Sequence, residues 1–350
     1  MTSVRVPVDV DELTPAWLSA ALGTKVTGAT VLDRHSGTTG RVRLAVRYAD
    51  ELAGRPSTLF VKLPPFDERQ RRFVDLVGLG TAEARFYRDL AAEVPVRVPL
   101  AHLAEVDDEG RYIMVLEDLV GSGCRFPALD DPDVGDFVGR VIDELAQLHA
   151  CFWGDPRLED GHAWVGAGGR QAFGGGGPFI QRAVDRFADE MPPAFRRLGE
   201  LYVEQAARIA ELFRVGPWTL AHGDPHFGNL FVDGERPGFL DWAMVMRRAG
   251  MWDVAYVLCN GLPPEVRRAN ERDWIRRYLE GLANGGVFLD EATAWEQYRL
   301  FAVYAWTSAT STAGVGDRWQ RAEYGHRGMT AATTAIDDLD SIGLLESLLG

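Results

Sequence analysis

Residues 222–229 read His-Gly-Asp-Pro-His-Phe-Gly-Asn and are followed by Asp241, and this pattern is the most informative one in the sequence. Two short apolar runs, Leu230–Val232 and Gly238–Leu240, are joined by a turn with an Asp-Gly pair, which predicts a hairpin. We expect this hairpin to return Asp241 beside Asn229. One amide and one carboxylate oxygen suit Mg²⁺, which keeps several waters and takes further ligands from substrate phosphates.

The spacing of the three polar residues also has a known counterpart. It is similar to the H-R-D-x-x-x-x-N motif of protein kinases. In that motif the Asp accepts a hydroxyl proton and the Asn binds a metal ion, and an Asp further along the chain also binds a metal ion. The resemblance implies phosphoryl transfer with Asp224 as base and with Asn229 and Asp241 as Mg²⁺ ligands.

Two other interpretations of the same segment stay open. The Gly-Asp-Pro-His sequence at 223–226 matches the opening of metallophosphatases, which would use Asp224 and His226. A two-metal site needs further ligands downstream, and His326 is the one histidine that follows. Alternatively, Asp224 and Asn229 cap a structural turn, a common role of Asx side chains.

Lys62 is the candidate residue for contact with the phosphates of a nucleotide donor, and Glu83 is its candidate ion-pair partner. The run Leu59–Leu63 predicts a strand in which Lys62 shares a face with Phe60. A lysine on such a partly covered surface needs a carboxylate partner. A helix beginning near Thr81 carries Glu83 on the edge of an apolar stripe, so we expect an ion pair that orients Lys62 toward phosphates.

Two backbone segments complete the predicted nucleotide site. Gly37 and Gly40 lie in a Ser-Gly-Thr-Thr-Gly loop between two predicted strands, where backbone N–H groups could close over phosphates. Glu117-Asp118-Leu119 follows the predicted strand Tyr112–Leu116. We interpret it as a hinge at which backbone groups of Glu117 and Leu119 hydrogen-bond to adenine.

The periodicity of apolar residues changes near residue 120. Before it, alternating patterns predict a small antiparallel sheet with one helix, preceded by a lead-in helix that starts after Thr14. After it, apolar residues recur every three or four positions, which predicts helices. We therefore expect an α+β protein with two lobes, 1–119 binding nucleotide and 120–350 carrying the acceptor site. Seven glycines within 166–177 indicate a surface loop.

Composition narrows the class of partner. The net charge of -14 and pI near 5.0 argue against nucleic acid. The cysteines Cys124, Cys151 and Cys259 are far apart and form no metal-binding motif, which favours a reducing cytoplasm. The sequence also has no signal-peptide pattern or membrane-spanning run, so no membrane insertion is expected.

Taken in order, these motifs resemble the aminoglycoside phosphotransferase and choline kinase-like superfamily between Ala29 and Tyr256. The segments Glu83–Tyr87, Met114–Leu119 and Leu145–Ala150 are similar to its ecdysteroid-kinase-like branch. The resemblance implies a protein-kinase-like bilobal fold, ATP or GTP as donor, and a small-molecule alcohol as acceptor.

The same resemblance gives roles to single residues. It implies that Lys62 contacts phosphates, with Glu83 as its ion-pair partner. Asp253 resembles an acidic residue that follows the metal motif, and we interpret it as a helix cap. Asp241-Trp242-Ala243 stands where protein kinases have Asp-Phe-Gly, so an activation loop is not predicted.

The sequence leaves alternatives open for the identity of the acceptor and for catalytic activity. Aminoglycosides, macrolides, sugars and choline-like alcohols all fit, although the aromatic helix after Asp290 favours a hydrophobic alcohol. A non-catalytic nucleotide-binding protein with the same fold is the alternative from another class.

Overall fold

The computed structural model describes residues 5–50, 54–166, 177–315 and 322–350. They form two compact units, each described here by itself. The first runs to Phe126 and also includes Phe231–Met244, and the second comprises Pro127–Leu230 and Val245–Gly350. The predicted glycine-rich loop lies, apart from its end residues, outside the described part of the chain.

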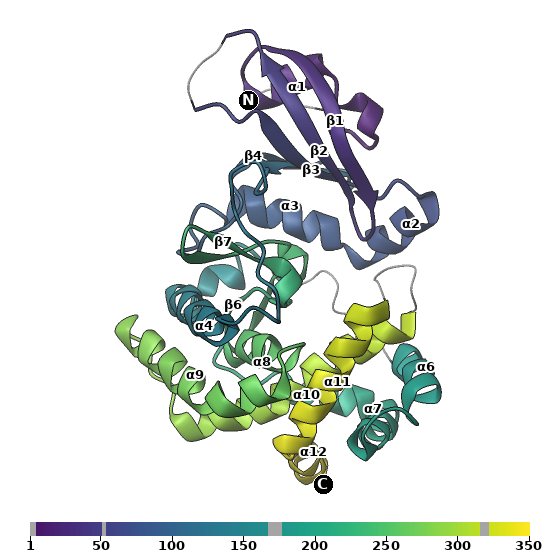
Figure 1. Ribbon diagram of the computed structural model, residues 1–350, viewed down its shortest axis with the longest axis vertical. Coiled ribbons are helices and arrows are strands. Elements are labelled where there is room, and N and C mark those ends of the chain that lie inside the picture. Colours follow the sequence, from purple (N-terminus) through teal and green to yellow (C-terminus); the bar gives the residue numbers. More distant parts are fainter. Residues whose placement is uncertain (1–4, 51–53, 167–176, 316–321) are drawn as a thin grey trace. The chain divides into compact units, whose positions relative to one another are not determined.

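A five-stranded antiparallel sheet forms the centre of the first unit (Figure 1). Its strand order is β1-β2-β3-β5-β4, and every neighbouring pair is antiparallel. The strands are β1 Val26–Ser36, β2 Gly40–Tyr48, β3 Thr58–Leu63, β4 Ala101–Val106 and β5 Tyr112–Glu117. The predicted antiparallel sheet is therefore confirmed.

The two faces of this sheet differ in chemistry because side chains alternate along a strand. One face is apolar and fully buried, and its core includes Val42 and Leu44 of β2 and Val61 of β3. The lead-in helix α1, Pro15–Leu22, contributes Leu18 to this core, and the Thr14 side chain caps it as the sequence predicts. The other face carries the charged side chains of the candidate site.

Two helices connect β3 to β4. They are α2, Glu68–Val77, and α3, Leu79–Asp89, and α3 lies along β4 and β5. Gly78 separates them with a φ of 71°, a left-handed conformation that glycine adopts without steric cost. Helix α3 confirms the predicted helix, and α2 is an addition that the apolar pattern did not reveal.

The segment 231–244 adds a second small sheet to this unit. Strand β7, Leu230–Asp233, pairs with β8, Arg236–Phe239, and the short 3-10 helix η4, Trp242–Met244, follows. The hairpin predicted on the carboxyl side of Asn229 is thus present. It delivers Asp241 to the first unit.

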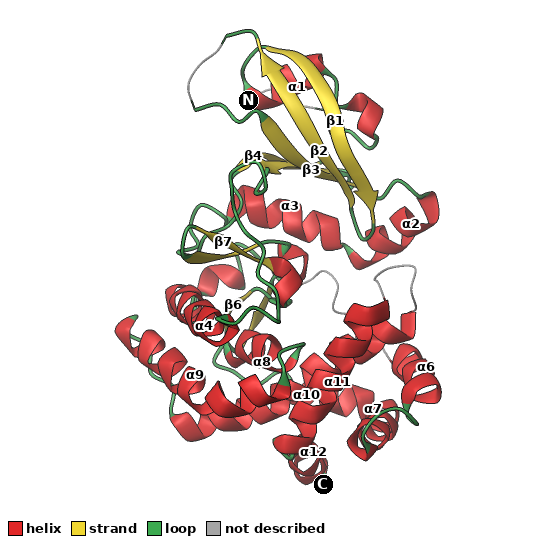
Figure 2. Ribbon diagram, viewed as in Figure 1, coloured by secondary structure: helices red, strands yellow, loops and turns green. Residues whose placement is uncertain are grey.

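Helices dominate the second unit (Figure 2). Helix α10 packs against α6, α8 and α11, and α4 packs against α9. A short antiparallel pair, β6 with β9, supports the 222–229 loop. The elements are α4 Val134–Cys151, α6 Gly177–Phe187, α7 Pro193–Leu212, β6 Thr219–Ala221, η3 Phe227–Asn229, β9 Met246–Arg248, α8 Met251–Cys259, α9 Pro264–Asn284, α10 Glu291–Val315, α11 Ala322–Asp338 and α12 Ser341–Leu349.

The α+β class, with a sheet-based first part and a helical remainder, is confirmed by this architecture. Within the described ranges, no helix is both long enough and apolar enough to cross a bilayer.

Candidate active site

Lys62 and Glu83 form the predicted ion pair in the first unit. Lys62 Nζ lies 2.7 Å from Glu83 Oε1 and 2.6 Å from Oε2. The side chains are 4% and 0% exposed, so the pair is shielded from solvent. Burial raises the pKa of the Glu83 carboxyl to about 7, against the lowering effect of Lys62. Lys62 thus favours the charged form of the Glu83 carboxyl, which burial disfavours.

We expect Glu83→Ala to lower the free energy of unfolding by about 3–5 kcal/mol, because it leaves Lys62 buried without its main counter-charge. Glu83→Gln keeps the volume and a hydrogen-bond acceptor, so its loss should be smaller. Urea denaturation measures both. The control is Glu68→Ala, which removes an exposed pair with Arg72 and should cost at most about 0.5 kcal/mol. A loss below about 1 kcal/mol in Glu83→Ala would contradict the prediction.

Asp241 belongs to the same cluster. Its Oδ1 lies 3.3 Å from Lys62 Nζ, and its Oδ2 accepts a hydrogen bond from Arg41 at 3.2 Å. The backbone of Asp241 is left-handed, with φ of 62°, a conformation that Asp tolerates better than most residues. Backbone outliers of this kind gather at functional sites.

Trp242 fixes the segment that carries Asp241. Its ring stacks on Phe86 of α3 with centroids 4.0 Å apart and an interplanar angle of 6°. Its Nε1 donates to the Phe239 carbonyl at 3.3 Å, and the side chain is fully buried. Trp242 therefore connects the Asp241 segment to the helix that bears Glu83.

The predicted glycine loop connects β1 to β2. Gly37 N–H donates to the Thr39 carbonyl at 3.0 Å, which closes a tight turn. Gly40 has a packing role, because a Cβ there would lie 2.5 Å from the Phe66 ring and 2.8 Å from the Pro64 carbonyl. Packing therefore accounts for Gly40, whereas a Cβ at Gly37 would meet only the His35 ring at 3.9 Å. The contact of both residues with phosphates stays a prediction.

At the predicted hinge, several groups already have partners. The Glu117 carboxylate accepts two hydrogen bonds from Arg97, both 2.8 Å, and Glu117 N–H donates to the Leu100 carbonyl at 2.8 Å. The Leu119 carbonyl accepts from Cys124 N–H at 2.9 Å. The binding of a purine by backbone groups of Glu117 and Leu119 stays a prediction.

In the second unit, the 222–229 loop places Asp224 and Asn229 in contact. Asn229 Nδ2 donates to the backbone carbonyl of Asp224 at 2.9 Å and to its Oδ2 at 3.2 Å. His226 caps η3 through its Nδ1, which accepts from Gly228 N–H. The Asp224 side chain is 27% exposed. It is thus a fixed carboxylate that solvent or a ligand can reach.

Asp253 of α8 holds the backbone of this loop, which corrects the sequence interpretation. Its carboxylate accepts from His222 N–H at 2.6 Å and from Gly223 N–H at 2.9 Å. No side chain caps α8, which begins after Gly250. The expected helix-capping role is therefore wrong. The carboxylate turns to the loop because the buried N–H groups of His222 and Gly223 need a hydrogen-bond acceptor.

A buried histidine extends this network. His149 of α4 lies with Nε2 3.2 Å from Asp253 Oδ2 and with Nδ1 2.9 Å from the Tyr278 hydroxyl. Because a carboxylate accepts hydrogen bonds only, Nε2 is the donor to Asp253. Asp253 thus holds three groups from α4 and the loop. Sequence reasoning noted His149 only as part of a family-like segment.

Two tyrosines, from helices α8 and α10, lie near Asp224. The Tyr304 hydroxyl of α10 donates to the Gly223 carbonyl at 3.1 Å, and the Tyr256 hydroxyl of α8 lies 2.8 Å from Ser308 Oγ. Burial, and then the Asp224 carboxylate, raises the pKa of both phenols well above the ordinary value. Both therefore stay neutral beside Asp224.

The donor atoms fit a magnesium ion. Since Asn229 donates through Nδ2, its amide turns Oδ1 away from Asp224, and Oδ1 is the atom that can coordinate a cation. Asp241 supplies a carboxylate, and both are hard oxygen ligands. The described residues include no cluster of three or more His, Cys, Asp or Glu side chains placed to hold a metal. Asn229 and Asp241 belong to different units, so their joint binding of one ion stays a prediction.

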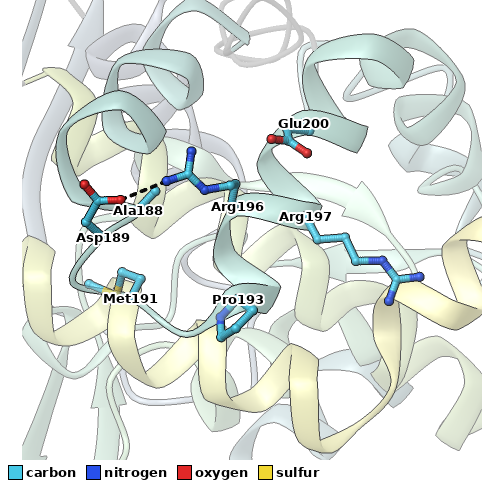
Figure 3. A pocket seen from close by; sticks show the side chains of 7 residues that line it. All are labelled: Ala188, Asp189, Met191, Pro193, Arg196, Arg197 and Glu200. Atoms are coloured by element: carbon cyan, nitrogen blue, oxygen red, sulfur yellow. Dashed lines mark hydrogen bonds and ion pairs between the residues drawn. The ribbon is translucent and has the colours of Figure 1, made fainter.

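A hollow of about 400 Å³ occurs elsewhere in the second unit, at the turn between α6 and α7 (Figure 3). Its most polar contact is the ion pair of Asp189 with Arg196 at 3.0 Å. It contains none of the predicted site residues. Its lining residues are Ala188, Asp189, Met191, Pro193, Arg196, Arg197 and Glu200.

The chain belongs to the phosphotransferase enzyme family, whose sequence model matches residues 40–301. The match spans the whole run from Gly40 through Lys62 and Glu83 to Asp253. The comparison with curated proteins gave no match. The family membership confirms the predicted relationship to the aminoglycoside phosphotransferases and choline kinases.

Solved structures share the fold across nearly the whole chain. One, from Ralstonia eutropha and provisionally assigned as an aminoglycoside phosphotransferase, is 15% identical with a TM-score of 0.57, covering 95% of this chain and 98% of that one. A choline kinase from Cryptosporidium parvum is 12% identical with a TM-score of 0.54, covering 97% of each chain. A GDP and kanamycin complex of an aminoglycoside phosphotransferase is 12% identical with a TM-score of 0.52, covering 92% and 97%. The predicted kinase-like fold is thereby confirmed.

Proposed function

We propose that this phosphotransferase moves the terminal phosphoryl group of ATP or GTP to a hydroxyl group of a small molecule. The observation that carries the proposal is the contact of Lys62 with both Glu83 and Asp241. Three residues far apart in the sequence meet there in the arrangement that kinases use for donor phosphates. The family membership supports the same reaction class.

In this mechanism Asp224 accepts the proton of the acceptor hydroxyl as its oxygen attacks phosphorus. Asn229 and the loop backbone hold the carboxylate in place, and its partial exposure leaves room for an alcohol. Lys62 would neutralise charge on the leaving phosphate oxygens. Mg²⁺, held by Asn229 Oδ1 and the Asp241 carboxylate, would supply further charge neutralisation when bound.

The purine donor and the compartment are part of the same proposal. The Glu117 carbonyl and the Leu119 N–H would bind the base, since the Glu117 N–H is already used by Leu100. A related fold has been solved with GDP, which supports nucleotide use. Cys124, Cys151 and Cys259 form no disulfide among the described residues, which fits a reducing cytoplasm.

The acceptor is proposed as a small-molecule alcohol. Most aromatic side chains of α10, including Tyr298 and Trp306, are buried in the core, whereas Tyr304 reaches the 222–229 loop. The proteins with this fold include a choline kinase and a kanamycin complex. Choline-like, aminoglycoside and hydrophobic alcohols therefore belong in the first assay.

The test is acceptor-dependent release of ADP or GDP by purified protein with Mg²⁺, ATP or GTP, and a panel of such alcohols. At least one alcohol should raise nucleoside diphosphate release above the level without acceptor. Nucleotide binding without turnover across a broad panel would indicate a non-catalytic protein. Phosphate release from simple esters without nucleotide would indicate a phosphatase using Asp224 and His226. Either result would contradict the proposal.

A further inference from the structure

Arg41 and Lys62 place two cations side by side on one face of the sheet. In the β2–β3 ladder Arg41 is the direct partner of Lys62, so both side chains leave the sheet on the same side. Like charges directly opposite each other destabilise a sheet. An anion is therefore required between them, and Asp241 fills this place, with one carboxylate oxygen 3.2 Å from Arg41 and the other 3.3 Å from Lys62.

Arg41 differs from the neighbouring cations Lys62 and Arg43 in the number of its contacts with carboxylates. Lys62 is buried and bound by both oxygens of Glu83. Arg43, two residues further along β2, is bound by Asp118 at 2.8 and 3.2 Å. The Arg41 side chain is 38% exposed, and it contacts Asp241 at 3.2 Å and Thr39 Oγ1 through a long hydrogen bond of 3.4 Å. More than a third of the Arg41 side-chain surface is therefore accessible, in contrast to the buried Lys62.

The geometry points to Arg41 as a second phosphate-binding residue that acts beside Lys62 on the terminal phosphates of the donor nucleotide. This inference rests on the proposed function and names a residue outside the predicted site. Arg41 shares the single charge of Asp241 with Lys62, so it can take further negative charge with or without Mg²⁺. The phosphates supply that charge, and a guanidinium can bind two of their oxygens at once.

The experiment is titration calorimetry of the full chain with ATP, GTP and adenosine, each with Mg²⁺ and with EDTA. Arg41→Gln should weaken binding of the triphosphate that the wild type binds by about 10- to 100-fold. It should leave adenosine affinity within about twofold, since adenosine has no phosphates. Arg41→Lys should recover part of the loss, because it keeps the charge but not the planar fork.

A matched control separates this effect from the change in net charge. Arg47→Gln removes the same charge from the same face of β2 at an exposed position, and it should not change nucleotide affinity. Thermal unfolding of both variants checks that the sheet is intact. The loss in Arg41→Gln should persist in EDTA, because it concerns phosphates directly.

Three outcomes would overturn the inference. Unchanged triphosphate affinity in Arg41→Gln would remove Arg41 from the site. A loss seen only with Mg²⁺ would show that Arg41 acts through Asp241 and not on phosphates. A wild type that binds no nucleotide at all would overturn the proposed function together with this inference, whereas the first two outcomes leave the proposed function standing.

Discussion

Asp224→Asn is expected to reduce kcat by about 10²- to 10⁴-fold, the usual contribution of a general base. The amide has almost the same shape, so Asn229 keeps its backbone contact with residue 224. What is lost is the ability to accept the acceptor proton. Affinity for nucleotide should stay within about threefold, because Lys62 and Glu83 are unchanged.

Single-turnover phosphoryl transfer, together with calorimetric nucleotide titration, measures the two quantities separately. Asp189→Asn, at a fully exposed surface position, is the matched control and should leave both unchanged. If Asp224→Asn retained more than about a tenth of the wild-type rate, Asp224 would not be the base.

Asp253→Ala is expected to reduce both stability and activity. It removes the acceptor of the His222 and Gly223 N–H groups and of His149 in a fully buried place. Each unsatisfied buried group costs about 1–3 kcal/mol, and the loss of a buried charged partner costs about 3–5 kcal/mol. We expect the free energy of unfolding to fall by about 4 kcal/mol.

Activity should fall as well, because the loop that positions Asp224 loses its anchor. Asp253→Asn keeps the volume and one acceptor oxygen, so its loss of stability should be smaller while kcat still decreases. Urea denaturation and steady-state kinetics test both variants. Asp273→Ala, an exposed side chain of α9, should change neither quantity by much. A stable Asp253→Ala variant with normal kcat would refute the anchoring role.

Local patterns were sufficient to predict contacts that a strand or a helix sets by its own geometry. Lys62 follows from alternation along β3, and Glu83 follows from the apolar stripe of α3, so their meeting was predictable. The hairpin before Asp241 was predictable from its turn residues. Whether Asn229 and Asp241 share one ion stays a prediction, because they belong to different units.

Other features depend on partners distant in the sequence. Asp253 was interpreted as a helix cap because its position at the start of α8 is typical of one. Its true partners lie far upstream, at His222, Gly223 and His149. Arg41 was not among the predicted site residues, because its place opposite Lys62 depends on the register between β2 and β3. Helix α2 was missed because its first turns are Glu-Arg-Gln-Arg-Arg, without an apolar stripe.

The path of the chain limits how the protein can be dissected. The first unit is completed by the distant segment 231–244, which brings Trp242 onto Phe86 and Asp241 onto Lys62. A gene fragment that stops at Phe126 would encode the whole sheet but would lack these two side chains. Such a truncated protein should expose the Phe86 ring, aggregate on expression, and regain solubility only when a peptide with the missing segment is supplied.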